Sequence, residues 1–329
     1  MLKKIYAASA GTGKTTQIIN DFVNKINNLE DLKAKLKTTV FITFSNSAAD
    51  EIKSKLYKKI KKLKSKLDKD ETKSATDIIE FNVYTIHSFC LRVIKFLRHY
   101  YYLPLDIDFF PSDEKNEITL WSTCVDEYFE NLTNEDKIEK FFKLVNIDNC
   151  KNFLKRYGFL IFAMDELGFT QTENYQQSQI DENSVENNGI KLKDIIENCE
   201  DEKESFNKVL QELERQKLTN NDLYNYLNYL KIKGKEIFNE IVKKIYYEIY
   251  LKKIHIEGIM DYDTSVFLVC KGIKQMNVKN FFDLLKESGW EIKEIYVDEA
   301  QDNDVIQNYF VVMLAKTIQQ TESEPTITI

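Results

Sequence analysis

The sequence predicts an α/β fold in which a parallel sheet is interrupted by a large helical insertion. Apolar runs typical of buried strands occur at residues 5–7, 38–44, 81–86 and 292–297. Helical patterns follow these runs, and a strand–helix–strand order requires a parallel sheet. From about residue 104 to 258 the strand patterns disappear, and aromatic and charged residues interleave at helical periods. That central stretch is the predicted insertion.

Bulk composition agrees with a mostly helical chain. The 329 residues are enough for two domains, or for one domain that carries a large insertion. The chain has only 9 glycines and 3 prolines, which favours long helices with few sharp turns. Its net charge of −7 does not suggest a surface coated in positive potential, although a local basic groove is enough to follow a phosphate backbone.

The cysteines and the apolar runs indicate a cytoplasmic protein. No two cysteines form a CxxC pair, so we expect reduced core thiols and neither a zinc site nor an iron–sulfur cluster. No apolar run approaches the length of a membrane span, and the first residues belong to the first predicted strand. We therefore expect no signal peptide and no membrane anchor. The cysteines are Cys90, Cys124, Cys150, Cys199 and Cys270.

A small-residue loop links the first predicted strand to a helix that opens at Gly13. Loops of this form cradle nucleotide phosphates with their backbone N–H groups, and glycine supplies the backbone freedom that they need. Ala8 stands where the general motif has its first glycine, so a turn before an ordinary helix stays open as an alternative. The loop residues are Ala8, Ser9, Ala10, Gly11, Thr12, Gly13, Lys14, Thr15 and Thr16.

A second motif lies at the end of the strand predicted at 292–297, which delivers Asp298 and Glu299. An adjacent pair of carboxylates is common on solvated surfaces and means little by itself. After a buried strand, and together with a phosphate loop, the first acid can hold magnesium and the second can polarise the attacking water. In the same class of site Lys14 contacts the β- and γ-phosphates, and Thr15 binds magnesium through its hydroxyl. The two motifs together indicate nucleotide hydrolysis.

A basic amphipathic helix is predicted to begin near Ala48, after the polar residues 45–47 that can cap it. Its apolar positions recur at helical spacing, with lysines between them at positions 53, 55, 58, 59, 61, 62, 64 and 66. Two interpretations stay open. The lysines form either a solvated face balanced by acidic residues elsewhere, or a surface that lies near nucleic acid.

Two further stretches have local interpretations. His87 follows the strand predicted at 81–86 and precedes an apolar helix through Leu97. Open α/β sheets place ligands at the carboxyl ends of strands, which favours a functional histidine over a structural one. Residues 171–189 are rich in Gln, Asn, Ser and Glu, so we expect a mobile surface loop there.

Four separated stretches resemble the UvrD/Rep-like superfamily 1 DNA helicases, and in particular the RecB/AddA-like branch. They are residues 8–15, 43–52, 84–90 and 297–302, which match the phosphate loop, motif Ia, a Thr-x-His-x-Phe-Cys motif and motif II. Alanine at the first loop position is normal in that branch. Softer similarities are Asp108-Phe109 with Asp113-Glu114, and Asp261-Tyr262-Asp263.

The resemblance implies a RecA-like P-loop NTPase domain that uses ATP and Mg²⁺. Residues 1–103 and 259–329 would form this motor domain, and residues 104–258 the helical insertion subdomain. Carried over by position, Lys14 and Thr15 would bind ATP phosphates and magnesium, and Asp298 the magnesium. Glu299 would be the catalytic base, and Gln301 would couple the nucleotide to DNA.

The resemblance also implies a path for single-stranded DNA along Thr43, Phe44, Asn46 and His87. An aromatic ring there can stack on a base of any sequence, while polar groups hold phosphates. The alternative for Phe44 is a side chain in the core. The implied activity is that of a 3′-5′ helicase or translocase of DNA repair and recombination.

The family continues beyond motif II with parts that this sequence does not contain, namely motif III and a second RecA-like domain. We therefore expect the amino-terminal part of a helicase, which alone would bind ATP weakly and unwind no DNA. Expected partners are single-stranded or duplex-end DNA, other helicase–nuclease subunits, or a separately encoded second motor domain. A non-catalytic DNA-binding or regulatory fragment is the alternative. A P-loop kinase would explain neither the Thr-x-His-x-Phe-Cys stretch nor motif II.

Overall fold

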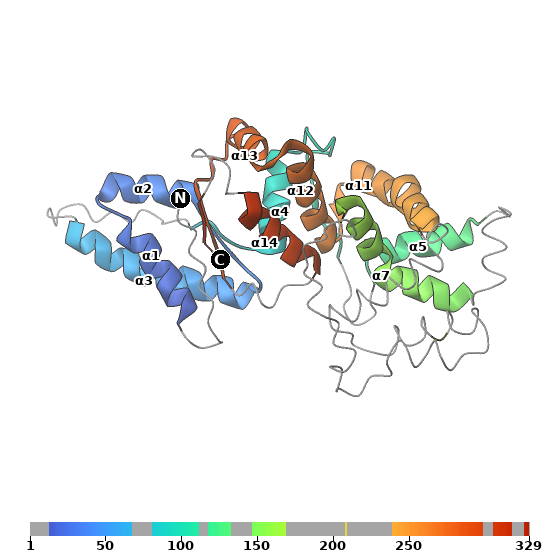
Figure 1. Ribbon diagram of the computed structural model, residues 1–329, viewed down its shortest axis with the longest axis horizontal. Helices are drawn as coiled ribbons and strands as arrows, with labels where there is room; N and C mark the ends of the chain where they lie inside the picture. The colour runs from blue at the N-terminus through green and yellow to red at the C-terminus, as the bar shows by residue number, and fades with distance from the viewer. Residues whose placement is uncertain are drawn as a thin grey trace. The chain divides into compact units, whose positions relative to one another are not determined.

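The computed structural model divides the chain into two compact units (Figure 1). One unit comprises Met1–Leu105 with Tyr262–Ile329, and the other comprises Asp106–Asp261. The boundaries predicted from the sequence, 103/104 and 258/259, differ from these limits by two and three residues. The structure describes residues 13–67, 81–111, 118–132, 147–168, 208, 239–298, 305–317 and 326–328.

A four-stranded parallel sheet, in the order β2-β1-β5-β6, organises the first unit. The strands are β1 (Thr39–Thr43), β2 (Val83–Thr85), β5 (Glu294–Val297) and β6 (Thr326–Thr328). Phe41 pairs with Val83 on one side and with Tyr296 on the other. The predicted parallel sheet is confirmed for β1, β2 and β5, whereas the run at residues 5–7 lies outside the described part of the chain.

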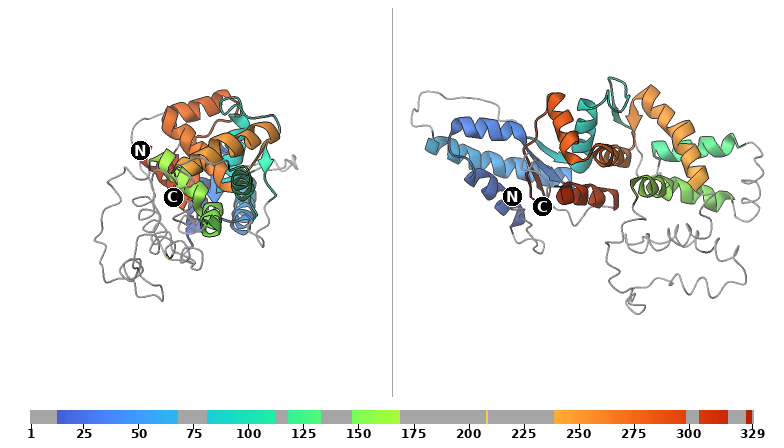
Figure 2. Two further views of the ribbon diagram at one scale, coloured as in Figure 1. Left: turned by 90° about the vertical axis from the view of Figure 1, so that its right-hand side faces the viewer. Right: turned by 45° about the horizontal axis from the view of Figure 1, so that its top comes forward.

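Three helices cover one face of this sheet: α1 (Lys14–Asn24), α2 (Leu29–Thr38) and α3 (Asn46–Leu67) (Figures 1 and 2). Apolar side chains of α1 and α3 pack with the strands into one core. The Phe22 ring meets the edge of Phe41 at 5.4 Å, and Phe41 stacks on Tyr296 at 5.0 Å. These contacts fix the helix that follows the loop against the strand that precedes Asp298.

Four helices lie on the other face: α4 (Ile86–Phe96), α12 (Tyr262–Met276), α13 (Val278–Glu287) and α14 (Val305–Thr317). The Phe89 ring of α4 lies 5.7 Å from Trp290 and 5.9 Å from Phe310. The sequence indicated α4 by its apolar pattern. It did not lead us to α2, which Asn28 caps by accepting a hydrogen bond from the backbone N–H of Asp31 at 2.8 Å.

The second unit is helical around an aromatic core. Its helices are α5 (Leu120–Glu130), α7 (Ile147–Leu167), the π-helix η1 (Ile245–Tyr250) and α11 (Leu251–Glu257). The rings of Phe162 and Tyr246 stack at 3.9 Å, and Trp121 meets Tyr250 at 5.5 Å. The carboxylate of Asp261 accepts hydrogen bonds from the N–H groups of Leu120 and Trp121, so it caps α5 across 140 residues of sequence.

One expectation for this unit is wrong. We expected no strands between about residues 104 and 258, but β3 (Asp108–Phe109) lies in this range and pairs in parallel with β4 (Ile259–Met260). The Asp108 N–H donates to the Gly258 carbonyl and the Phe110 N–H to the Met260 carbonyl, each at 2.9 Å. Backbone pairing holds these two-residue strands, so no alternating pattern marks them in the sequence. The loop expected at 171–189 lies outside the described residues.

Candidate functional site

Gly13 sets the start of α1. Its backbone has φ 83° and ψ 19°, in the left-handed region that glycine adopts without strain. No atom lies within 4 Å of the position that a Cβ would take, so the glycine is required for backbone conformation rather than for space. Lys14, Thr15 and Thr16 then form the first turn of α1, where free N–H groups and the helix dipole favour an anion.

The central contact of the site joins Thr15 to Asp298. The Thr15 hydroxyl donates a hydrogen bond of 2.6 Å to Oδ2 of Asp298, across 283 residues of sequence. Asp298 directly follows β5, and its own N–H donates to the Ile42 carbonyl at 2.9 Å, which extends the pairing of β5 with β1. Only 7% of Asp298 is exposed. The sheet therefore holds the Asp298 carboxylate next to the first turn of α1.

A hydroxyl and a carboxylate at this separation offer two hard oxygen atoms. Magnesium suits such a pair, because it is usually bound by one or two carboxylates together with substrate phosphates and water. Among the residues that the structure describes, no group of three or more His, Cys, Asp or Glu side chains could hold a metal ion. Residues 8–12, Glu299 and Gln301 lie outside the described part of the chain.

The residues predicted to line a DNA path differ in exposure. Phe44 is 42% exposed directly after β1, so it is not a core side chain, and Asn46 is exposed at the start of α3. Thr43 is wholly buried, at 0% exposure. All five residues of β1 are buried, since helices cover both faces of the sheet, and the contact of Thr43 with DNA stays a prediction.

His87 lies in the first turn of α4 and meets side chains from α12 and α14. Its Nε2 is 3.2 Å from Nε2 of Gln307 and 3.7 Å from Oδ1 of Asp263. The Tyr262 ring lies 5.3 Å from the imidazole. Sequence reasoning missed Gln307, which is only 3% exposed. The adjacent amides Gln307 and Asn308, in a stretch that is otherwise mostly apolar, were the available sign of a buried polar contact.

The described cysteines match the expectation of buried thiols. Cys90, Cys124, Cys150 and Cys270 are free and buried. Burial raises the pKa of the Cys124 thiol to about 12, and it raises the pKa of Cys150 and Cys270 further. Cys199 lies outside the described residues. No helix in the described part of the chain is both long and apolar enough to cross a membrane.

A glycine turn into a helix, joined by a hydroxyl–carboxylate bond to the end of a parallel strand, is typical of α/β proteins that bind nucleotides at the carboxyl edge of a sheet. The chain belongs to the UvrD/REP helicase N-terminal domain family, whose model matches residues 4–322. The resemblance seen in the four motifs is confirmed.

Several curated relatives are similar to a part of the chain. The protein is 31% identical over 164 residues to an ATP-dependent helicase/nuclease subunit from Clostridium beijerinckii, which covers 47% of this chain and 13% of that relative. A protein of the same name from Clostridium botulinum is 32% identical over 158 residues, covering 46% and 12%. One from Bacillus cytotoxicus is 28% identical over 144 residues, covering 43% and 11%. The matches therefore span no more than 13% of the length of these relatives.

Proposed function

We propose that this chain is the ATP-binding motor part of a 3′-5′ DNA helicase or translocase that acts in DNA repair and recombination. Membership of the UvrD/REP helicase family supports the class of reaction. The hydrogen bond between Thr15 and Asp298 carries the proposal for this chain, because it brings the two predicted magnesium ligands together. In this proposal residues 1–103 and 259–329 form a RecA-like domain, and residues 104–258 form an inserted helical subdomain.

The nucleotide would lie at the start of α1. The loop from Ala8 to Thr12, with Gly13, would surround the phosphates, and Lys14 would place its charge on the β- and γ-phosphates. Thr16 completes the first helical turn. The N–H groups of this turn have no earlier helical carbonyl to bind, which leaves them free for an anion.

Thr15 and Asp298 would hold magnesium. Their oxygens are of the type that this ion prefers, and the sheet already fixes Asp298 through its backbone. When bound, magnesium neutralises negative charge on the β- and γ-phosphates. Glu299 would accept the proton of the attacking water, and Gln301 would relay the state of the nucleotide to bound DNA.

The DNA contact that we propose uses Phe44, Asn46 and His87. The exposed Phe44 ring can stack on a base, and the Asn46 amide can bind a phosphate. The contact of His87 with Gln307 orients the imidazole at the start of α4. The partners we propose are single-stranded or duplex-end DNA, together with other helicase–nuclease subunits or a separately encoded second motor domain.

Nucleotide binding by the Lys14→Ala variant tests the proposal. We expect the Kd of a fluorescent ATP analogue, measured with magnesium, to rise at least about tenfold, because a charge-assisted hydrogen bond contributes about 1.5–3 kcal/mol. Lys33→Ala is the matched control, since it removes an exposed lysine of α2 away from the site. Equal affinity in wild type and Lys14→Ala would reject the phosphate site.

A further inference from the structure

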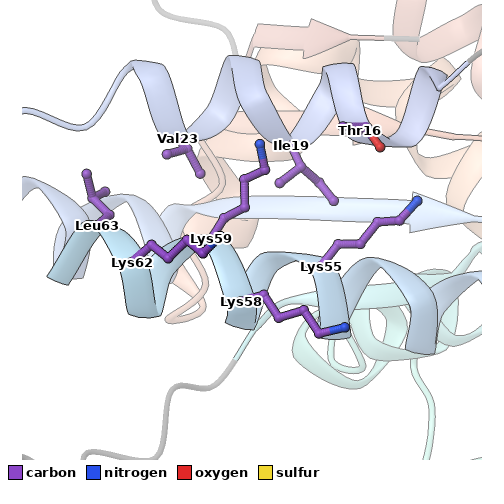
Figure 3. Close-up of a pocket in the computed structure, with 8 residues that line it drawn as sticks. All are labelled: Thr16, Ile19, Val23, Lys55, Lys58, Lys59, Lys62 and Leu63. Carbon is purple, nitrogen blue, oxygen red and sulfur yellow. The ribbon is translucent and has the colours of Figure 1, made fainter. Parts of the chain in front are cut away.

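A groove of about 380 Å³ lies between α1 and α3 (Figure 3). We call it the lysine groove. Its α1 side presents one hydroxyl and two aliphatic side chains, and its α3 side presents four lysines and a leucine. The lining residues are Thr16, Ile19, Val23, Lys55, Lys58, Lys59, Lys62 and Leu63.

The four lysines form a regular ladder on α3. Positions 55, 58, 59 and 62 share one side of the helix, and the rise along the helix from the first to the last is about 10 Å. Of the described residues that line the groove, none is acidic. Lys55 forms an ion pair of 2.5 Å with Glu51, and Lys59 reaches across to the Asn20 side chain of α1. The local charge is positive although the whole chain carries −7.

The floor between these charges is aliphatic. Val23 lies across the groove from Leu63, Ile19 lies between Val23 and Thr16 along α1, and the lysine stems extend this apolar surface. The Thr16 hydroxyl lies at one end of the groove. A ligand that fits this arrangement carries regularly spaced negative charges and tolerates contact with aliphatic carbon.

We infer that the lysine groove binds the sugar–phosphate backbone of a nucleic acid. Lysine ammonium groups and threonine hydroxyls are both common phosphate contacts, and they read no sequence. The groove residues include no aromatic ring, so it has no platform on which a base could stack. The lysine groove can therefore contact the sugar–phosphate backbone and not the bases.

An acidic protein segment is the competing occupant, and the groove suits it less well. The cores of protein interfaces are enriched in aromatic residues, methionine and arginine and depleted in lysine. The lysine groove has the opposite composition. Its charges also repeat at about one helical turn, which matches a polymer with charge at every unit better than a folded surface.

The lysine groove would give the proposed helicase a second contact with DNA. The inference rests on the proposed function only in taking DNA as the nucleic acid that is bound. Lys55 is nine residues after Asn46 in the same helix, so the groove begins about 13 Å farther along α3. It is therefore separate from the proposed path at Phe44 and Asn46. A nucleic acid that reached both would be held over more than one turn of helix α3.

The test is the salt dependence of binding to a fluorescent duplex oligonucleotide by the full chain. The groove variant is Lys58→Gln/Lys59→Gln/Lys62→Gln. Its matched control is Lys53→Gln/Lys61→Gln/Lys64→Gln, which removes the same charge from the same helix but from residues that do not line the groove. Both variants keep the proposed ATP-site residues, so nucleotide binding stays at the wild-type value.

The slope of log affinity against log salt is negative, and we expect its magnitude to fall by about 2.7 in the groove variant, because each lost phosphate contact removes about 0.9. The control should lower it by less than about 1. Equal losses in the two variants would overturn the inference, since they would report net charge alone. Loss of binding to an acidic poly-glutamate peptide, with duplex binding unchanged, would assign the groove to a protein instead. Failure of the Lys14→Ala test would affect the ATP site and leave this result standing.

Discussion

Replacing Thr15 with valine removes one hydroxyl from the site and keeps the shape of the side chain. The lost bond is 2.6 Å long and ends on a carboxylate that is almost buried. Hydrogen bonds to charged groups contribute about 1.5–3 kcal/mol, so we expect the free energy of unfolding to fall by that amount at neutral pH. For a unit of this size the corresponding fall in Tm is about 3–12 °C.

The assay is urea or thermal unfolding, with Thr15→Ser as the matched control. Serine restores the hydroxyl and should recover most of the lost stability. MgATP should raise the Tm of the wild type, because a ligand at about 100 times its Kd adds about 2.7 kcal/mol to the native state. Thr15→Val should gain much less from MgATP. The reasoning would be refuted by a Thr15→Val protein as stable as the wild type and equally stabilised by MgATP.

Three further changes test other parts of the structure. Gly13→Ala places a Cβ in open space on a residue with φ 83°. It should lower the free energy of unfolding by about 1–2 kcal/mol, because alanine is strained in this backbone conformation, and urea unfolding measures the change. Gly158→Ala would put a Cβ 3.0 Å from the Trp121 ring and should destabilise the second unit by about 1–3 kcal/mol, read from Trp fluorescence on unfolding. Burial raises the pKa of Cys124 to about 12, so the unfolded chain loses this proton first and stability should fall as pH rises above about 8.5. Cys124→Ala should reduce that fall, and an unchanged pH profile would contradict the assigned cause.

Much of the sheet could be predicted because its strands are marked by residue type. β1 is the run Thr-Val-Phe-Ile-Thr, whose residues are all buried, and β5 combines apolar residues with an acid at its end. α4 was indicated by its apolar periodicity, and the cap at its start is visible as Thr85, whose hydroxyl accepts from the Ser88 N–H. In these elements local sequence and tertiary burial favour the same structure.

The parts that were missed depend on contacts distant in sequence. β3 and β4 are two residues each, and they exist because residues 108 and 259 are brought together by the fold. The contact of His87 with Gln307 joins side chains 220 residues apart, and neither residue implies the other. Thr43 shows a related difficulty. Its motif suggested contact with DNA, whereas its side chain is buried in a strand that is covered on both faces, which the motif alone does not reveal.

The proposed ATP site was predictable in its residue types and less so in its geometry. Lys14, Thr15 and Asp298 follow from two motifs, each next to an element of recognisable pattern. That the Thr15 hydroxyl reaches Asp298 depends on how β5 pairs with β1 and how α1 packs on the sheet. Only the three-dimensional structure supplies this relation.

The most direct test of the central claim is calorimetric titration of the full chain with ATP, in magnesium and in excess chelator. The account predicts binding that requires magnesium and that weakens at least about tenfold in Asp298→Asn, a loss of about 1.4 kcal/mol. Asp283→Asn, an exposed carboxylate of α13, should bind as the wild type does. Binding of equal strength without magnesium, or in Asp298→Asn, would contradict the account.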